Sequence, residues 1–151
     1  QPVARDVREV VSVLYIIVDL ERMGDYAEGI GRVTLQFPED FDFAAYEELR
    51  EIFQTMARKA CRMLEKSMET FFARDVDGAK EVCFSDDEVD LLYRNACDYI
   101  FTAADCHIDI LTRLSWIAHN LERIADRTTN IAERTVFLVT GNVEEIGSSK
   151  Y

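Results

Sequence analysis

The stretch LERMGD at Leu20–Asp25 recurs as LERIAD at Leu121–Asp126, and these two copies decide how the chain folds. Aligning the copies also superposes Ile30 on Ile131. Before the first copy, apolar residues recur every three or four positions, which is the period of one helix face. Each copy therefore lies on a long helix. The distance between the copies exceeds the periods of the common solenoids, so the sequence favours a duplicated helical unit.

The rest of the sequence keeps the helical period, and both prolines lie outside the periodic stretches. We predict helices at about 3–34, 43–74, 76–102 and 103–140, the last one stopped by Gly141. Helices of about 30 residues are roughly 45 Å long, which suits an antiparallel bundle. The prediction is an all-α fold with a complete antiparallel three-helix bundle at 43–141 and a C-terminal tail at 142–151. Residues 1–36 form the last helix of a first bundle whose other two helices are missing.

The N-terminal segment carries two further expectations. It has no initiator Met, which suggests a fragment or a processed chain. Without two bundle partners, the first helix leaves an apolar stripe uncovered, and such a stripe drives dimerisation, pairing with a missing segment or aggregation.

Charge and composition exclude several classes of protein. The 151 residues include 29 acidic and 17 basic side chains, a net charge of −12, so nucleic acid is repelled. No apolar run reaches the roughly 20 residues of a membrane span, and no signal peptide opens the sequence. The four cysteines have no zinc-site spacing, and we expect buried, reduced thiols in a soluble, cytoplasmic protein.

Pairs of carboxylates four residues apart are the main candidates for chemistry, because such residues share one helix face. The pairs are Glu21 with Asp25, Glu122 with Asp126, and Asp86 with Asp90. In each long helix the pair continues a stripe of apolar residues, so we expect the acids to point inward. A buried carboxylate must be protonated, paired with arginine or bound to metal. Spacing alone leaves an internal ion-pair network and a metal site equally open.

Catalytic patterns are not visible in the sequence. The Glu-x-x-His elements of di-iron bundles are absent, and no nucleophile with a partnering base can be identified. His107 and His119 are too far apart on the last predicted helix to share a ligand face. A catalytic nucleophile is therefore not apparent from the sequence.

The sequence resembles the PhoU family. The residues that carry the resemblance are Gln1–Arg8, Leu20–Ala27, Asn120–Glu133 and Val136–Gly141. The family fold is two three-helix bundles related by duplication. The resemblance therefore implies one long helix of the first bundle followed by the whole second bundle.

The resemblance also implies that the carboxylate pairs bind transition-metal ions, with iron or zinc as the candidates and magnesium as an alternative. The implied ligands in the second bundle are Glu122, Asp126, Asp86 and Asp90, extended by Asn130 and Glu133. Glu21 and Asp25 are the implied ligands in the first bundle. There, however, Gly29 and Arg32 stand at the positions of Asn130 and Glu133.

By the same resemblance, the chain is a non-enzymatic regulator of phosphate uptake and phosphate-starvation signalling. The resemblance implies contacts with a phosphate ABC transporter ATPase and a sensor histidine kinase at the cytoplasmic membrane face. The uncovered apolar stripe of the first helix adds the expectation of a homo-oligomer, such as a homodimer. Membrane contact is then only peripheral, through those partners. The alternatives are a metal-dependent enzyme or metal store that uses the same carboxylates, and a helical interaction module without metal.

Overall fold

The computed structural model describes residues 2–102, 107–143 and 146. Across these residues the chain forms four α-helices and one short 3-10 turn, and no strand. The elements are α1 (Pro2–Thr34), η1 (Phe43–Tyr46), α2 (Glu47–Ala73), α3 (Val76–Thr102) and α4 (Ile108–Thr140). The predicted all-α fold is confirmed. The predicted start of the last helix at Ala103 lies outside the described residues.

The second predicted helix begins later than its periodicity suggested. Residues 43–46 form the 3-10 turn, in which the Asp42 carboxylate accepts a hydrogen bond from the Ala44 N–H at 2.8 Å. Acidic side chains at Glu47 and Glu48 then open α2, where they face the positive end of the helix dipole. The apolar period runs through both segments, so periodicity alone could not separate them.

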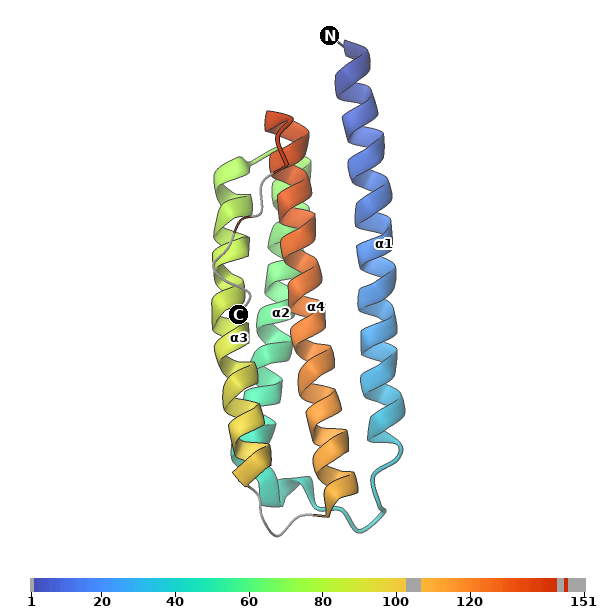
Figure 1. Ribbon diagram of the computed structural model, residues 1–151, viewed down its shortest axis with the longest axis vertical. Coiled ribbons are helices and arrows are strands. Elements are labelled where there is room, and N and C mark those ends of the chain that lie inside the picture. The colour runs from blue at the N-terminus through green and yellow to red at the C-terminus, as the bar shows by residue number, and fades with distance from the viewer. Residues whose placement is uncertain (1, 103–106, 144–145, 147–151) are drawn as a thin grey trace.

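Helices α2, α3 and α4 form a bundle, and α1 lies along the outer side of α4 (Figure 1). The bundle core is dry and tightly packed, with Leu49, Met56, Val89 and Leu114 at most 1% exposed. Small residues on α4, such as Ala118 and Ala125, are fully buried and let its neighbours approach closely. Helix α4 is thus the central element, in contact with each of the other three helices.

Helices α1 and α4 run antiparallel (Figure 1) and keep one register along their whole length. Four facing pairs define this register: Arg8 with Gly141, Tyr15 with Arg134, Asp19 with Asn130, and Gly29 with Asn120. Successive pairs are separated by equal steps on the two helices. The interface is therefore straight, without a bulge or slip.

Two of these pairs are copies of each other. In the alignment of the two motifs, Asp19 matches Asn120 and Gly29 matches Asn130. Asp19 accepts a hydrogen bond from Asn130 at 3.2 Å, while a Cβ on Gly29 would lie 3.6 Å from the Asn120 amide. The helices α1 and α4 thus pack around a local two-fold axis, as expected for duplicated elements.

The face of α1 that points away from α4 is apolar and exposed, as the sequence predicted. Val7, Val10, Leu14 and Ile17 are each more than half exposed. Glu21 and Asp25, which continue this stripe, are also exposed. The prediction that these two acids point inward is therefore wrong. Residues 10–18 of α1 are apolar on almost every side, so periodicity could not show that Ile16 and Met23 form its buried face.

The C-terminal ends of α2 and α4 have recognisable backbone caps. Gly141 adopts the left-handed conformation (φ 78°) at the end of α4, and its N–H bonds to the Phe137 carbonyl at 2.8 Å. Arg74 ends α2 in the same left-handed conformation (φ 57°). It is the one described non-glycine residue with a positive φ. Within the described residues, the helices lack a stretch long and apolar enough to span a membrane.

Candidate carboxylate site

The two copies of the motif occupy different environments. On α4, Asp126 is buried and Glu122 is half-buried, whereas on α1 Glu21 and Asp25 face solvent. In both copies the two acids lie four residues apart on one face of a long helix. The difference arises because, among the described residues, α4 packs against three helices, whereas α1 packs mainly along α4.

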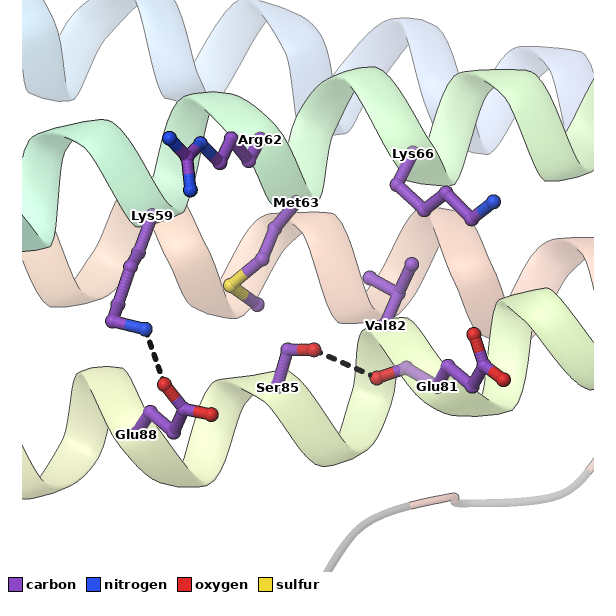
Figure 2. A pocket seen from close by; sticks show the side chains of 8 residues that line it. All are labelled: Lys59, Arg62, Met63, Lys66, Glu81, Val82, Ser85 and Glu88. Carbon is purple, nitrogen blue, oxygen red and sulfur yellow. Dashed lines mark hydrogen bonds and ion pairs between the residues drawn. The ribbon is translucent and has the colours of Figure 1, made fainter.

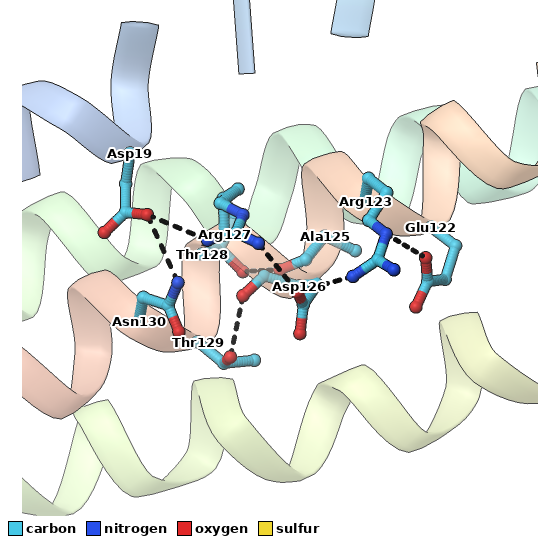
Figure 3. Close-up of polar contacts among 9 residues, drawn as sticks. All are labelled: Asp19, Glu122, Arg123, Ala125, Asp126, Arg127, Thr128, Thr129 and Asn130. Atoms are coloured by element: carbon cyan, nitrogen blue, oxygen red, sulfur yellow. Dashed lines mark hydrogen bonds and ion pairs between the residues drawn. The ribbon is translucent and has the colours of Figure 1, made fainter. Parts of the chain in front are cut away.

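Around the second copy, charged groups form a continuous chain that links α4 to α1 (Figure 3). Asp126 lies 3.5 Å from Arg127 and 3.7 Å from Arg123, and Arg123 also lies 3.7 Å from Glu122. On the α1 side, the buried Asp19 lies 3.4 Å from Arg127. Three carboxylates thus face two guanidinium groups, and each guanidinium bridges two acids.

Burial decides how much this network contributes. The side chain of Asp126 is 6% exposed and that of Asp19 is 9% exposed, with Arg127 between them at 16%. Removing one member of a buried ion pair strands the other charge away from water, which costs several kcal/mol. The neighbouring hydroxyls of Thr128 and Thr129 donate to the Ala125 and Asp126 carbonyls at 2.7 and 2.8 Å, so they do not compete for the carboxylates.

Acidic side chains also lie on α3, where that helix packs against α4, and we call this interface the seam. Asp86 and Asp90 are half-buried on α3. Burial, together with the Glu133 and Asp86 carboxylates, raises the pKa of the Cys83 thiol to about 12. The charges of one acid on α3 and one acid on α4 therefore both act on the Cys83 thiol. Carboxylates of both helices thus lie along the interface of α3 and α4.

Further along this seam, aromatic and polar side chains meet. Burial raises the pKa of Tyr93, and its hydrogen bond to Cys97 and the charge of Glu122 act in the same direction. Burial also lowers the pKa of His119, assisted by the positive charge of Arg123. The rings of Tyr93 and Trp116 lie 6.5 and 6.1 Å from the His119 ring.

The donor atoms of this seam are carboxylate oxygens, which hard cations and iron accept as ligands. In the described part of the chain, however, no three His, Cys, Asp or Glu side chains are grouped so that they could hold a metal ion. Arg123 forms ion pairs with Glu122 and Asp126. Glu133 accepts a hydrogen bond from the Ile146 N–H at 3.0 Å. The guanidinium of Arg123 therefore supplies a positive charge where a metal ion at these two acids would lie.

The first copy has lost this environment. Gly29 and Arg32 replace the amide and the acid of the second copy, and Arg32 forms an exposed ion pair with Glu28 at 2.6 Å. Arg22, the counterpart of Arg123, is exposed. Glu21 and Asp25 are thus surface acids in this structure.

Sequence reasoning missed Asp19 and Arg127, the two residues that connect the helices. Asp19 directly precedes the first motif, so it could be taken for another surface acid. The signal lay in the alignment of the copies, where Asp19 matches Asn120 and both are buried polar residues.

The sequence analysis also missed a basic groove between α2 and α3, with a volume of about 230 Å³. Figure 2 shows Lys59, Arg62 and Lys66 along α2, opposite Glu81, Ser85 and Glu88 on α3. Lys59 forms an ion pair with Glu88 across the groove. Three basic and two acidic side chains line the groove, so its formal charge is only +1. The exposed Cys61 on α2 also departs from the prediction of buried thiols.

Comparison with known proteins gives consistent matches. The model of the PhoU domain family matches residues 1–34 and 53–135. A phosphate-specific transport system accessory protein PhoU homolog from Clostridium acetobutylicum is 34% identical over 142 residues, covering 92% of this chain and 63% of that protein. The homolog from Pseudomonas aeruginosa is 32% identical over 155 residues, covering 99% of this chain and 62% of that protein. The chain thus spans a little under two thirds of these relatives.

Solved structures agree. The phosphate transport system regulatory protein PhoU from Streptococcus pneumoniae superposes with a TM-score of 0.84 at 29% identity, covering 93% of this chain and 66% of that one. PhoU from Pseudomonas aeruginosa gives a TM-score of 0.70 at 28% identity, covering 94% of this chain and 68% of that one.

Proposed function

The chain belongs to the PhoU family, and from this premise we propose that it is a non-enzymatic regulator of phosphate uptake and of the response to phosphate starvation. It acts through contacts with other proteins. Its relatives are named as accessory or regulatory proteins of phosphate transport, which supports this role. The observation that carries the proposal is the match of family and fold over more than nine tenths of the chain.

The arrangement of the second motif agrees with a regulatory role. Its carboxylates are held by Arg123 and Arg127 in an ion-pair chain. A catalytic acid or base instead needs access to a substrate. An ion-pair chain between two helices is suited to fixing how those helices pack, and hence the shape of the surface that a partner recognises.

As partners we propose the ATPase subunit of a phosphate ABC transporter and a sensor histidine kinase, met in the cytoplasm. We also propose that the protein forms a homo-oligomer. The exposed apolar face of α1 supports an interaction with another helical surface.

A reporter assay tests the regulatory role. A bacterium that lacks its own relative and expresses a phosphate-starvation reporter should regain repression in high phosphate when this chain is supplied. Co-purification of the transporter ATPase or the kinase with the chain should accompany the repression. Full reporter activity in high phosphate, despite a folded and abundant protein, would contradict the proposal.

We further propose that the seam between α3 and α4 binds a transition metal, iron or zinc, or else magnesium. The ligands would come from Asp86, Asp90, Glu122, Asp126, Asn130 and Glu133. Bound metal would replace the guanidinium of Arg123 as the positive charge beside Glu122 and Asp126. Because Glu21 and Asp25 are exposed and lack these neighbours, they would bind metal only with a further helix beside them.

Elemental analysis of the purified protein after incubation with each metal tests this second proposal. The double variant Asp86→Asn/Asp126→Asn should lose the metal, while the matched Glu21→Gln/Asp25→Asn should keep it. Replacing Arg123 with glutamine should raise the metal affinity, because it removes the competing charge. Equal metal content in all the variants would contradict a site in the seam, and a hydrolase turnover abolished by Asp126→Asn would favour the metal-enzyme alternative.

A further inference from the structure

Three arginines from two different helix ends meet beside the C-terminus of α4. Arg5 and Arg8 come from the first turns of α1, and Arg74 caps the end of α2. Together with Leu138 and Val139 they line a pocket of about 220 Å³, which we call the arginine pocket. The chain carries a net charge of −12, so a cluster of three guanidinium groups runs against its overall composition.

The charge of the arginine pocket is only partly neutralised. Glu9 pairs with Arg74 at 3.1 Å and, within the described part of the chain, is the one acid in an ion pair with these arginines. Asp75 follows Arg74 in the sequence. Its carboxylate accepts a hydrogen bond from the Gly78 N–H at 3.0 Å, at the start of α3. Three positive charges and one negative charge leave a formal charge of +2 around the pocket.

Backbone and packing hold two of these arginines in place. Arg74 has a left-handed backbone (φ 57°) at a position where glycine or asparagine is the usual residue. A non-glycine residue in this region carries strain, and such strain often marks a side chain that is needed for function. Arg8 lies against Gly141, where a Cβ would come within 2.9 Å of its Nη1 atom. Its buried Nε has no hydrogen-bond partner among the described residues.

From this geometry we propose that the arginine pocket binds a small phosphate-class dianion, either free inorganic phosphate or the phosphoryl group of a small metabolite. Guanidinium groups match tetrahedral oxyanions because their N–H groups donate two parallel hydrogen bonds. A dianion balances the formal charge of +2, and it offers an acceptor to the Nε of Arg8. Leu138, which is buried, and Val139 supply the apolar part of the pocket wall.

The inference does not rest on the regulatory role proposed above, since it follows from the pocket alone. A purely structural part for the arginines is the competing explanation. Helices α2 and α4 both end here, and cations near a helix C-terminus offset the negative end of its dipole. In that case the arginines would stabilise the fold and phosphate would have no effect.

Titration calorimetry and thermal unfolding with inorganic phosphate, at fixed ionic strength, separate the two explanations. Phosphate should bind saturably and raise the melting temperature, while chloride at matched ionic strength should not. Arg8→Gln and Arg5→Gln should each weaken phosphate binding roughly ten- to hundred-fold, the range for hydrogen bonds to a charged group. Arg8→Lys, which keeps the charge but removes the fork, should also weaken binding.

The matched control is Arg62→Gln, which removes one arginine from the basic groove between α2 and α3 and should leave phosphate binding unchanged. Circular dichroism checks that each variant keeps its helices. Because Arg5 is exposed, its variant tests the pocket even where Arg8→Gln fails to fold. A parallel titration with glycerol phosphate identifies the source, since tighter binding of the ester indicates a phosphorylated metabolite. Absence of phosphate binding to the unsubstituted protein, or an equal loss in Arg62→Gln, would overturn the proposal.

Discussion

The two copies of the Leu-Glu-Arg-x-x-Asp motif hold the same residues in different surroundings. On α4 the acids are buried or half-buried and bridged by Arg123 and Arg127, whereas on α1 the acids face solvent. The contrast shows that a motif fixes where side chains lie on a helix, while the neighbouring helices decide whether those side chains become buried. The same acid should therefore have very different effects in the two copies.

The largest difference is expected between Asp126→Ala and Asp25→Ala. Asp126→Ala leaves Arg123 and Arg127 without their shared acid in a buried setting, and should lower the free energy of unfolding by about 3 kcal/mol. Asp25 is exposed, so Asp25→Ala should change the free energy of unfolding by less than about 0.5 kcal/mol. Urea unfolding followed by circular dichroism measures both. Equal losses would mean that the two copies share one environment.

A somewhat smaller effect is expected where the two helices meet. Asp19→Ala removes the acceptor of Asn130 and the second acid of Arg127, and should cost about 2 kcal/mol. Its matched control is Glu21→Ala, two residues further along α1 and exposed. Hydrogen exchange should show faster exchange in α1 for Asp19→Ala, with α2 and α3 little changed. If protection is lost evenly over all helices, the network does not act as a link specific to α1.

A third difference depends on pH. His119 precedes the second motif, and its counterpart before the first motif is Val18. Burial lowers the pKa of His119 in the folded protein, so the unfolded chain takes up the proton more readily as the pH falls. Stability should therefore decrease as the pH drops through about 6.5, the ordinary value for histidine.

The variant His119→Val makes the second copy resemble the first at this position and should reduce that loss. Urea unfolding at pH 7.5 and pH 5.5 provides the comparison. Identical losses on acidification in the variant and the unsubstituted protein would show that other groups control the acid response.

The smallest effect is expected on the surface of α1. Arg32 and Glu28 form an ion pair one turn apart, with both side chains more than half exposed. Arg32→Ala should cost only about 0.3 kcal/mol, and less at high salt, because water and salt screen the pair. Thermal unfolding at low and high salt tests this. A loss comparable to that of Asp126→Ala would show that α1 is buried against another surface in solution.

Much of the fold could be predicted from the sequence, because helical period and the two prolines restrict where helices lie. The predicted span of α3 matches the structure, and that of α1 differs by one residue at its start. The buried face of α1 could not be predicted, since apolar side chains occupy nearly all sides of residues 10–18. Which side is buried depends on the position of α4, and this information is not local.

The candidate site was predicted in part. Glu122 and Asp126 form ion pairs with Arg123 and Arg127, which is the alternative that the sequence left open beside a metal site. That these acids share one site with Asp86 and Asp90 stays a prediction. Whether a metal replaces Arg123 stays a prediction. Asp19 and the arginine pocket could not be found from spacing, because their partners lie more than sixty residues away in the sequence.

The uniform register of α1 against α4 also limits how these helices can slide. Moving α1 by one turn along α4 in one direction would bring Asp19 opposite Asp126, another carboxylate in a poorly hydrated setting. Like charges at that distance repel strongly where water is excluded. Axial displacement in that direction is thus opposed by charge as well as by packing, and α1 separates from α4 more easily by lifting away from it than by translation along it.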